Sequence, residues 1–137
     1  MASGDARNYG PLTGLSDFTR TAGTATALGS AVWVPVMEVL NIERTTRITG
    51  LQITLAGPAP TSPTYRISAK RQEDDNYRVI APPASDGQDV VSGQLDSFSH
   101  PIHLPKGASY RVEVYTTTAI GGSTAEVTIL NLIEFIP

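Results

Sequence analysis

The sequence predicts an all-β fold, an antiparallel two-sheet sandwich of the jelly-roll type with an extended N-terminal arm. From residue 32 onward, β-branched and aromatic residues alternate with polar ones. Glycines and prolines divide this region into about seven or eight short segments of strand character. No segment has a convincing helical period, and no cysteine pair is available to brace a different architecture. An immunoglobulin-like sandwich is the nearest alternative.

Composition limits the chain to one domain and excludes several functions. A chain of 137 residues with 40% hydrophobic content can bury a core without disulfides or metal. Ten scattered basic residues against thirteen acidic ones leave no footprint for nucleic acid. The lack of cysteine excludes thiolate metal sites and cysteine nucleophiles. Without a membrane-spanning apolar run or a signal peptide, a soluble, intracellularly made protein with no membrane partner is expected.

Residues 1–31 are rich in Ala, Gly, Ser and Thr and are assigned to the arm, with the sandwich domain at 32–137. Within the arm, Tyr9, Leu12, Leu15 and Phe18 recur about every three residues, which a purely flexible linker would not require. Three alternatives remain open for this segment. Its apolar residues cap the domain's own core, they dock on a neighbouring subunit, or the segment is a disordered tail.

The first segments after the arm are two strands with irregularities. Residues 32–42 are strongly apolar, but Pro35 cannot donate a ladder hydrogen bond, so this strand is placed at a sheet edge or at a bulge. Residues 47–55 carry one apolar face, and Gly50 is the predicted bulge. That apolar face consists of Leu51, Ile53 and Leu55.

The middle of the chain alternates more regularly. Residues 64–71 place Tyr65, Ile67 and Ala69 on a buried face and polar residues on a wet face. An acidic turn follows, then a short strand from residue 77, and an uncertain strand within residues 84–97.

The sequence between Ser99 and Thr118 has the clearest hairpin pattern. A short strand leads to a Pro-Lys-Gly turn at 105–107. The next strand places Tyr110, Val112 and Val114 opposite polar residues and Tyr115.

The last segment, from Thr124, is a long strand that is apolar on both faces in its second half. Leu130, Leu132 and Ile136 lie opposite the face that carries Val127 and Ile129. Exposing these side chains in a row would create an adhesive patch. Either an arm of the same chain or another subunit covers them.

The residues that could carry catalysis or bind metal do not form a recognised constellation. His100 and His103 are three apart and point to opposite sides of a strand, which is poor geometry for one metal ion. Glu73, Asp74 and Asp75 lack the spacing of a calcium loop. There is no nucleophile elbow, phosphate loop or dinucleotide motif. We therefore expect no enzyme activity, no cofactor and no metal.

Aromatic residues support an alternative function, a carbohydrate- or receptor-binding module such as a tail or fibre accessory. Trp33, Tyr65, Tyr77, Tyr110 and Tyr115 could supply a stacking platform for a sugar. However, Tyr65 and Tyr110 are in register with residues that face the core.

The overall layout resembles the small cement, or decoration, proteins of tailed-bacteriophage capsids, particularly those with a jelly-roll body. The resemblance covers the size and most of the chain, including "LPKGASYRVEVYTTTAI" and the terminal "AEVTILNLIEF". It is one of pattern, without a diagnostic short motif. Decoration proteins with a β-tulip body also carry an N-terminal arm.

The resemblance implies a non-enzymatic virion protein on the exterior of an icosahedral capsid, made in the host cytoplasm. It implies a homodimer or homotrimer that ties neighbouring major capsid proteins together and stabilises the expanded shell. In that scheme the patterning makes Tyr9, Leu12, Leu15 and Phe18 anchors on the capsid or on a partner subunit. Leu130, Leu132 and Ile136 become candidates for the self-association face.

Overall fold

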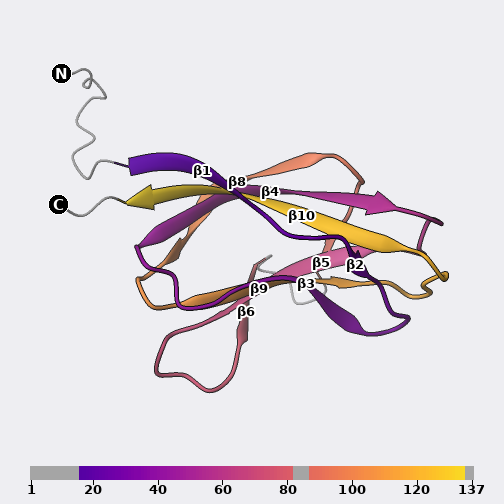
Figure 1. Ribbon diagram of the computed structural model, residues 1–137, viewed down its shortest axis with the longest axis horizontal. Helices are drawn as coiled ribbons and strands as arrows, with labels where there is room; N and C mark the ends of the chain where they lie inside the picture. The colour runs from indigo at the N-terminus through magenta and orange to yellow at the C-terminus, as the bar shows by residue number, and fades with distance from the viewer. Residues whose placement is uncertain (1–15, 82–86, 135–137) are drawn as a thin grey trace.

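The structure is a computed structural model, and it describes residues 16–81 and 87–134 (Figure 1). All regular structure in these residues is β, which confirms the predicted fold class. The strands are β1 Ser16–Ala22, β2 Thr26–Ala27, β3 Trp33–Val39, β4 Thr46–Ala56, β5 Thr64–Lys70, β6 Arg78–Ala81, β7 Gln88–Asp89, β8 Leu95–Leu104, β9 Ser109–Tyr115 and β10 Thr124–Glu134.

The strands form two antiparallel sheets that pack face to face. One sheet has the order β1-β10-β4-β8, with β2 also paired to β10. The other has the order β3-β9-β5-β6, with β7 also paired to β5. If the eight strands of four or more residues are lettered B to I along the chain, the sheets are B-I-D-G and C-H-E-F. This is the strand order of a jelly roll, so the predicted type of sandwich is confirmed as well.

The predicted hairpin around residues 105–107 is wrong. The turn forms as expected, with Gly107 at a φ of 91° and the Ala108 N–H donating to the Pro105 carbonyl over 3.1 Å. However, it connects β8 to β9, and these strands belong to different sheets. Turn chemistry indicates where the chain reverses, but it does not decide whether the flanking strands pair with each other.

The two sheets begin inside the segment that was assigned to the arm. β1 pairs with β10 from Ser16 opposite Glu134 to Ala22 opposite Thr128. The sandwich therefore includes residues from Ser16 onward, and the boundary predicted at residue 31 is too late. Threonine-rich sequence suits an edge strand as well as a linker, which is why composition placed the boundary wrongly. Tyr9, Leu12 and Leu15 lie outside the described residues.

Both predicted strand irregularities are present. β3 is an edge strand, and its register against β9 shifts between Pro35 and Met37. The register of β4 against β8 shifts between Ile48 and Gly50. A Cβ at Gly50 would lie 2.6 Å from the carbonyl oxygen of Asp96, so the bulge requires glycine.

The core lies between the sheets and is made by the inward residues of every long strand from β3 onward. Tyr65 and Tyr110 are among them, at 3% and 2% exposure, as their register predicted. The most deeply buried aliphatic side chains are Ile48, Leu51, Ile67, Val112, Val114, Val127 and Ile129. This packing fixes which side chains each sheet can present outward, because alternate residues of a strand face opposite sides.

Candidate functional surfaces

The outer face of β10 carries the predicted self-association residues. Leu130 and Leu132 are partly exposed there, and we call this pair the β10 stripe. In the register of the sheet, Leu130 lies between Arg20 of β1 and Gly50 of β4. Leu132 lies between Phe18 of β1 and Arg47 of β4.

The described part of the presumed arm does not cover this stripe. β1 lies beside β10 in the same sheet, so it pairs with the edge of β10 and leaves the outer face uncovered. Phe18, a predicted anchor, occupies a strand position opposite Leu132 in this sheet. Ile136, the third predicted self-association residue, lies outside the described residues.

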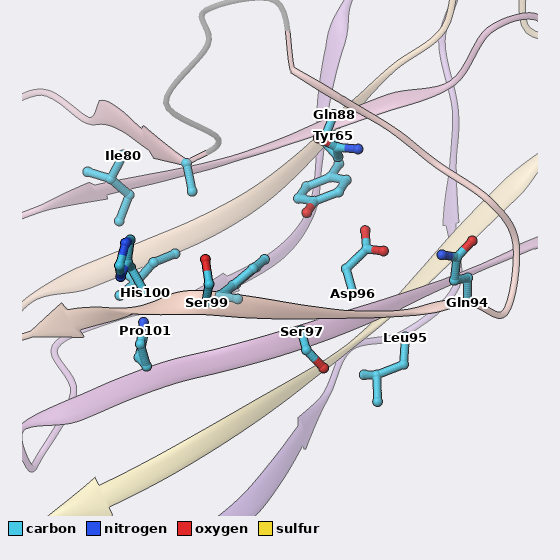
Figure 2. Close-up of a pocket in the computed structure, with 13 residues that line it drawn as sticks. Tyr65, Ile80, Gln88, Gln94, Leu95, Asp96, Ser97, Ser99, His100 and Pro101 are labelled. Carbon is cyan, nitrogen blue, oxygen red and sulfur yellow. The ribbon is translucent and has the colours of Figure 1, made fainter.

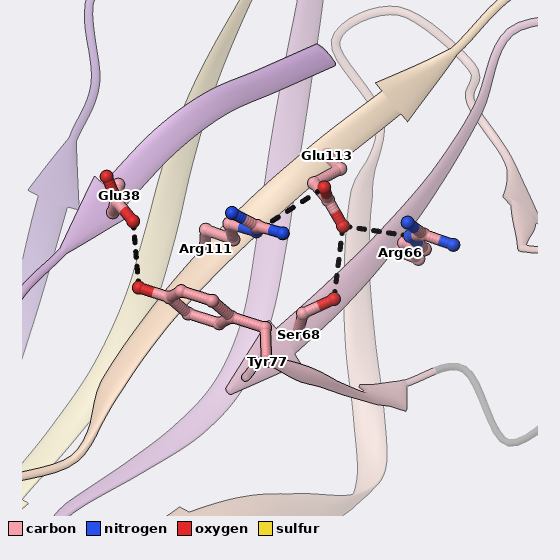
Figure 3. A network of polar contacts seen from close by, with 6 residues as sticks. All are labelled: Glu38, Arg66, Ser68, Tyr77, Arg111 and Glu113. Atoms are coloured by element: carbon pink, nitrogen blue, oxygen red, sulfur yellow. Dashed lines mark hydrogen bonds and ion pairs between the residues drawn. The ribbon is translucent and has the colours of Figure 1, made fainter. Parts of the chain in front are cut away.

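The outer face of the other sheet is organised around one buried carboxylate, Glu113 of β9, which is 3% exposed (Figure 3). The Arg66 Nε donates a hydrogen bond to Glu113 Oε1 over 2.8 Å. The Ser68 hydroxyl donates to the same oxygen over 3.1 Å. On the other side, the Arg111 Nε lies 3.4 Å from Glu113 Oε2. Two guanidinium groups therefore share one carboxylate.

Aromatic rings also contact the guanidinium groups of these two arginines. The guanidinium carbon of Arg66 lies 4.1 Å from the centroid of the Trp33 ring. That of Arg111 lies at the same distance from the Tyr77 ring, and the Lys70 Nζ lies 5.4 Å from it. At this distance a cation is attracted by the ring quadrupole. We call this surface, made of Trp33, Arg66, Lys70, Tyr77, Arg111, Glu113 and Tyr115, the aromatic–cation face.

Two further contacts fix the aromatic rings. The Tyr77 hydroxyl donates to Glu38 Oε2 over 2.8 Å (Figure 3). Burial and, secondarily, the hydrogen bond to Glu38 raise the pKa of Tyr77 to about 12. The Trp33 and Tyr115 rings are tilted against each other with centroids 5.3 Å apart.

Sequence reasoning found some of this face and missed its centre. The sequence pattern indicates Trp33, Tyr77 and Tyr115 as members of a stacking platform, whereas its basic residues are scattered along the chain. Alternation already placed Arg66 and Glu113 on the outer sides of their strands. The missing information was that β5 pairs with β9, with Arg66 directly opposite Glu113.

A cleft of about 720 Å³ opens where β8 runs past β6 and β7 (Figure 2). Its polar groups include the Tyr65 hydroxyl, Asp96 and His100. Burial and, secondarily, the neighbouring carboxylate of Asp96 raise the pKa of Tyr65. The phenol therefore stays protonated at neutral pH and cannot act there as a general base.

The residues considered for metal binding lie apart. His100 lines the cleft, whereas His103 lies opposite Arg47 in the β4–β8 pairing. In the acidic turn, Asp74 accepts a 3.2 Å hydrogen bond from Arg71 Nε, and that interaction lowers the pKa of Asp74. Across residues 16–81 and 87–134, no three His, Cys, Asp or Glu side chains are arranged to hold a metal ion.

Comparison with known proteins does not assign this chain to a family. No protein-family model and no curated protein matches this sequence. One solved structure that is similar is the crystal structure of the infectious bursal disease virus VP2 subviral particle. The alignment has a TM-score of 0.46 and 12% identity, and covers 87% of this chain but 33% of that chain. Separately, no helix in the described residues is long and apolar enough to cross a membrane.

Proposed function

We propose that the protein is a structural virion component that binds the outside of an icosahedral phage capsid and cements neighbouring major capsid proteins. The observation that carries the proposal is the β10 stripe, Leu130 and Leu132, on the outer face of the first sheet. The resemblance to phage decoration proteins and the jelly-roll strand order support it. Jelly rolls are used in viral capsids and also in lectins, so the fold agrees with both this function and the glycan-binding alternative.

The stripe has the character of a protein contact surface. Two adjacent outward leucines lie between strands that place Arg20 on one side and Arg47 on the other. An apolar centre with a charged rim is the usual arrangement of such surfaces. In the proposed assembly, the stripe joins two or three copies of the chain, and the predicted anchors contact the shell or a partner copy. One of these anchors, Phe18, lies in β1 opposite Leu132, next to the stripe.

The chemistry of the described side chains supports a binding role without catalysis. Glu113 is held by two arginines and a serine, and Tyr65 is kept protonated by burial and Asp96. With its pKa raised, the Tyr65 phenol is not poised to exchange protons near neutral pH.

Mass action explains how such a protein would stabilise a shell. A protein that binds the assembled, expanded shell and not its dissociated subunits shifts the equilibrium toward the intact shell. Because many identical copies act on one particle, each contact needs to contribute little free energy.

Copy number in particles tests the proposal. Quantitative mass spectrometry of gradient-purified virus particles should find the chain in a simple ratio to the major capsid protein. A few copies per particle would instead indicate a tail or fibre accessory. Absence from particles would overturn a virion role and favour the glycan-binding alternative.

A pair of variants tests the stripe. Leu130→Ser with Leu132→Ser should reduce self-association in analytical ultracentrifugation. The control is Val91→Ser with Ile120→Ser, which removes two aliphatic side chains that are 59% and 51% exposed in loops. An equal loss of self-association in both variants, or in neither, would remove the stripe from the proposal.

A further inference from the structure

We infer that the aromatic–cation face is a second docking surface, and that its partner is an acidic protein surface with clustered carboxylates. The inference deepens the proposed function and rests on it only in identifying that partner with the shell. The two sheets of a sandwich present their outer faces in opposite directions. A dimer joined through its β10 stripes would therefore expose two copies of the aromatic–cation face, one for each of two neighbouring shell subunits.

The first argument is that no described residue occupies the outer nitrogens of either guanidinium group. Arg66 and Arg111 each approach Glu113 through Nε. Among the described residues, their terminal nitrogens have no hydrogen-bond partner. These arginine side chains are 24% and 30% exposed, so a partner can reach them. A guanidinium fork of this kind is suited to binding a carboxylate through two hydrogen bonds.

The second argument is that the cations are already ordered. Arg66 is held between Glu113 and the Trp33 ring, and Arg111 between Glu113 and the Tyr77 ring. Immobilising a long side chain on binding costs conformational entropy, and here folding has already restricted both arginine side chains. Such preorganisation favours a specific contact over diffuse charge attraction.

The third argument is charge. The aromatic–cation face holds three cations, Arg66, Lys70 and Arg111, and one carboxylate, Glu113, which is buried and already shared. The centre of the face is therefore positive although the whole chain carries −3, and the exposed carboxylates Glu38 and Asp89 lie at its margin. Electrostatic complementarity therefore selects an acidic partner.

The fourth argument favours a protein over an acidic saccharide. A sugar ring binds against an open aromatic face, but guanidinium groups already lie over Trp33 and Tyr77. The carboxylates of a protein partner can bind the outer guanidinium nitrogens without needing an open aromatic face. Tryptophan, tyrosine and arginine are also the residues most enriched at the energetic centres of protein interfaces.

The first experiment uses Trp33, the only tryptophan in the chain, as a fluorescent reporter within the face. The full-length protein is titrated with a hexaglutamate peptide at low ionic strength. We expect a saturable change in Trp33 fluorescence that becomes smaller with added salt, and hexalysine should produce no such change. Lack of a saturable response to hexaglutamate would overturn the inference.

Variants distinguish binding through the planar guanidinium groups from general attraction between opposite charges. Arg66→Lys with Arg111→Lys keeps both charges and should raise the half-saturating peptide concentration about tenfold, because lysine lacks the planar fork. Replacing both arginines alone would leave Glu113 buried without a counter-charge and could unfold the protein. The combined Arg66→Gln, Arg111→Gln and Glu113→Gln variant avoids this, and it should lose the response.

The control for the combined variant is Lys106→Gln, an exposed turn substitution with the same net change in charge. It should bind hexaglutamate as the unmodified protein does. Equal binding by the combined variant would overturn the inference, provided that its thermal unfolding shows a folded protein. Saturation by oligogalacturonate but not by hexaglutamate would assign the face to an acidic saccharide and overturn the protein partner.

Particle binding distinguishes this inference from the proposed function. The combined variant should be retained less well than the Lys106→Gln control on particles stripped of the native protein. Full retention of the combined variant would overturn the shell as partner while leaving the proposed function intact. Hexaglutamate binding by a chain that is absent from particles would refute the proposed function and leave the acidic-partner preference standing.

Discussion

Glu113 is the residue on which the outer surface of the second sheet depends. It is 3% exposed and lies within 3.4 Å of Nε atoms from two arginines. Removing one member of a buried ion pair is costly because the remaining charge keeps its desolvation penalty. Here the arginines retain some access to water, which moderates that penalty.

We predict that Glu113→Ala lowers the free energy of unfolding by about 2–3 kcal/mol, measured by urea denaturation. Glu113→Gln should lower it less, because the amide oxygen can still accept from Ser68. Asp74→Ala is the control, since the Arg71–Asp74 pair lies at the surface and its loss should leave the midpoint unchanged. A similar effect of Asp74→Ala and Glu113→Ala would contradict this account of Glu113.

Tyrosine ionisation gives a prediction for alkaline pH. In the folded protein the pKa of Tyr77 and that of Tyr110 are each raised to about 12, in both cases mainly by burial. Because the ordinary value is about 10, the folded state holds more protons than the unfolded state between these values. The contribution of these two tyrosines to stability should be constant below about pH 10 and should be lost as pH rises from about 10 to about 12.

Glu38→Gln should lower the pKa of Tyr77 but not that of Tyr110, which has no contribution from Glu38. Burial remains, so Tyr77 should not return fully to its ordinary value. NMR titration of the assigned tyrosine ring signals measures the two groups separately. An unchanged Tyr77 titration in this variant would show that the hydrogen bond to Glu38 has no influence on ionisation.

Asn131 is a buried residue whose burial and hydrogen bond the sequence pattern does not predict. Alternation along the last strand places position 131 on the same face as Val127 and Ile129. A polar residue there gives no apolar signal, yet Asn131 is 2% exposed. Its Nδ2 donates to the Thr21 hydroxyl of β1 over 2.7 Å. That contact depends on a strand from the opposite end of the sequence, so local pattern could not predict it.

At the scale of elements, the turn after β4 depends on two glycines that come close together. Gly57 has a φ of 79°, and a Cβ there would collide with the carbonyl oxygen of Gly122, in the loop before β10. Both the left-handed backbone and this contact disfavour any side chain.

We predict that Gly57→Ala lowers the free energy of unfolding by about 3 kcal/mol. Gly93→Ala should lower it by only about 1 kcal/mol, because Gly93 has the same φ of 79° but open space around its Cα. Gly121→Ala, with neither constraint, should have no effect. Chemical denaturation of the three variants checks the order, and equal losses at Gly57 and Gly93 would exclude the collision.

Local sequence predicted the faces of strands well and their partners poorly. Tyr65, Ile67 and Ala69 are buried as alternation required, and Pro35 and Gly50 lie at irregular positions for the expected reasons. The false hairpin and the missed β1 have one cause. Pairing in this fold joins segments far apart in sequence, and residue periodicity carries no information about that.

The candidate surfaces divide in the same way. The β10 stripe was predictable because the second half of that strand is apolar on both faces, which can be read from one segment of the sequence. The aromatic–cation face was not, because its arginines and its carboxylate come from β5 and β9 and meet only through the Arg66–Glu113 register.

For the whole molecule, the jelly-roll order determines how quickly the chain can fold. Both β4 and β1 pair with β10, and most long strands lack a partner adjacent in sequence. Pairing two strands that are far apart in sequence closes a long loop, and this costs conformational entropy before the new contacts compensate for it. Folding rates therefore fall as the sequence separation between paired strands grows.

We predict refolding on a timescale of milliseconds to seconds or slower, measured by stopped-flow Trp33 fluorescence after dilution from urea. The β5–β6 turn is local and should matter little to the rate. A substitution in the centre of β10, such as Val127→Ala, should slow refolding if the β4–β10 pairing forms in the transition state. Refolding in microseconds would contradict the dependence on topology.

The position of β10 between β1 and β4 also bears on synthesis. A ribosome produces β1 first, and Thr124 at the start of β10 emerges roughly a hundred residues later. At about 5–20 residues per second, the nascent chain carries β1 without its partner for about 5–20 seconds, and one edge of β4 without the same partner for a shorter time. During that interval these edges are open to the same edges of chains on neighbouring ribosomes of the messenger RNA. Chaperones that bind extended segments would be most useful to this protein before its last strand is translated.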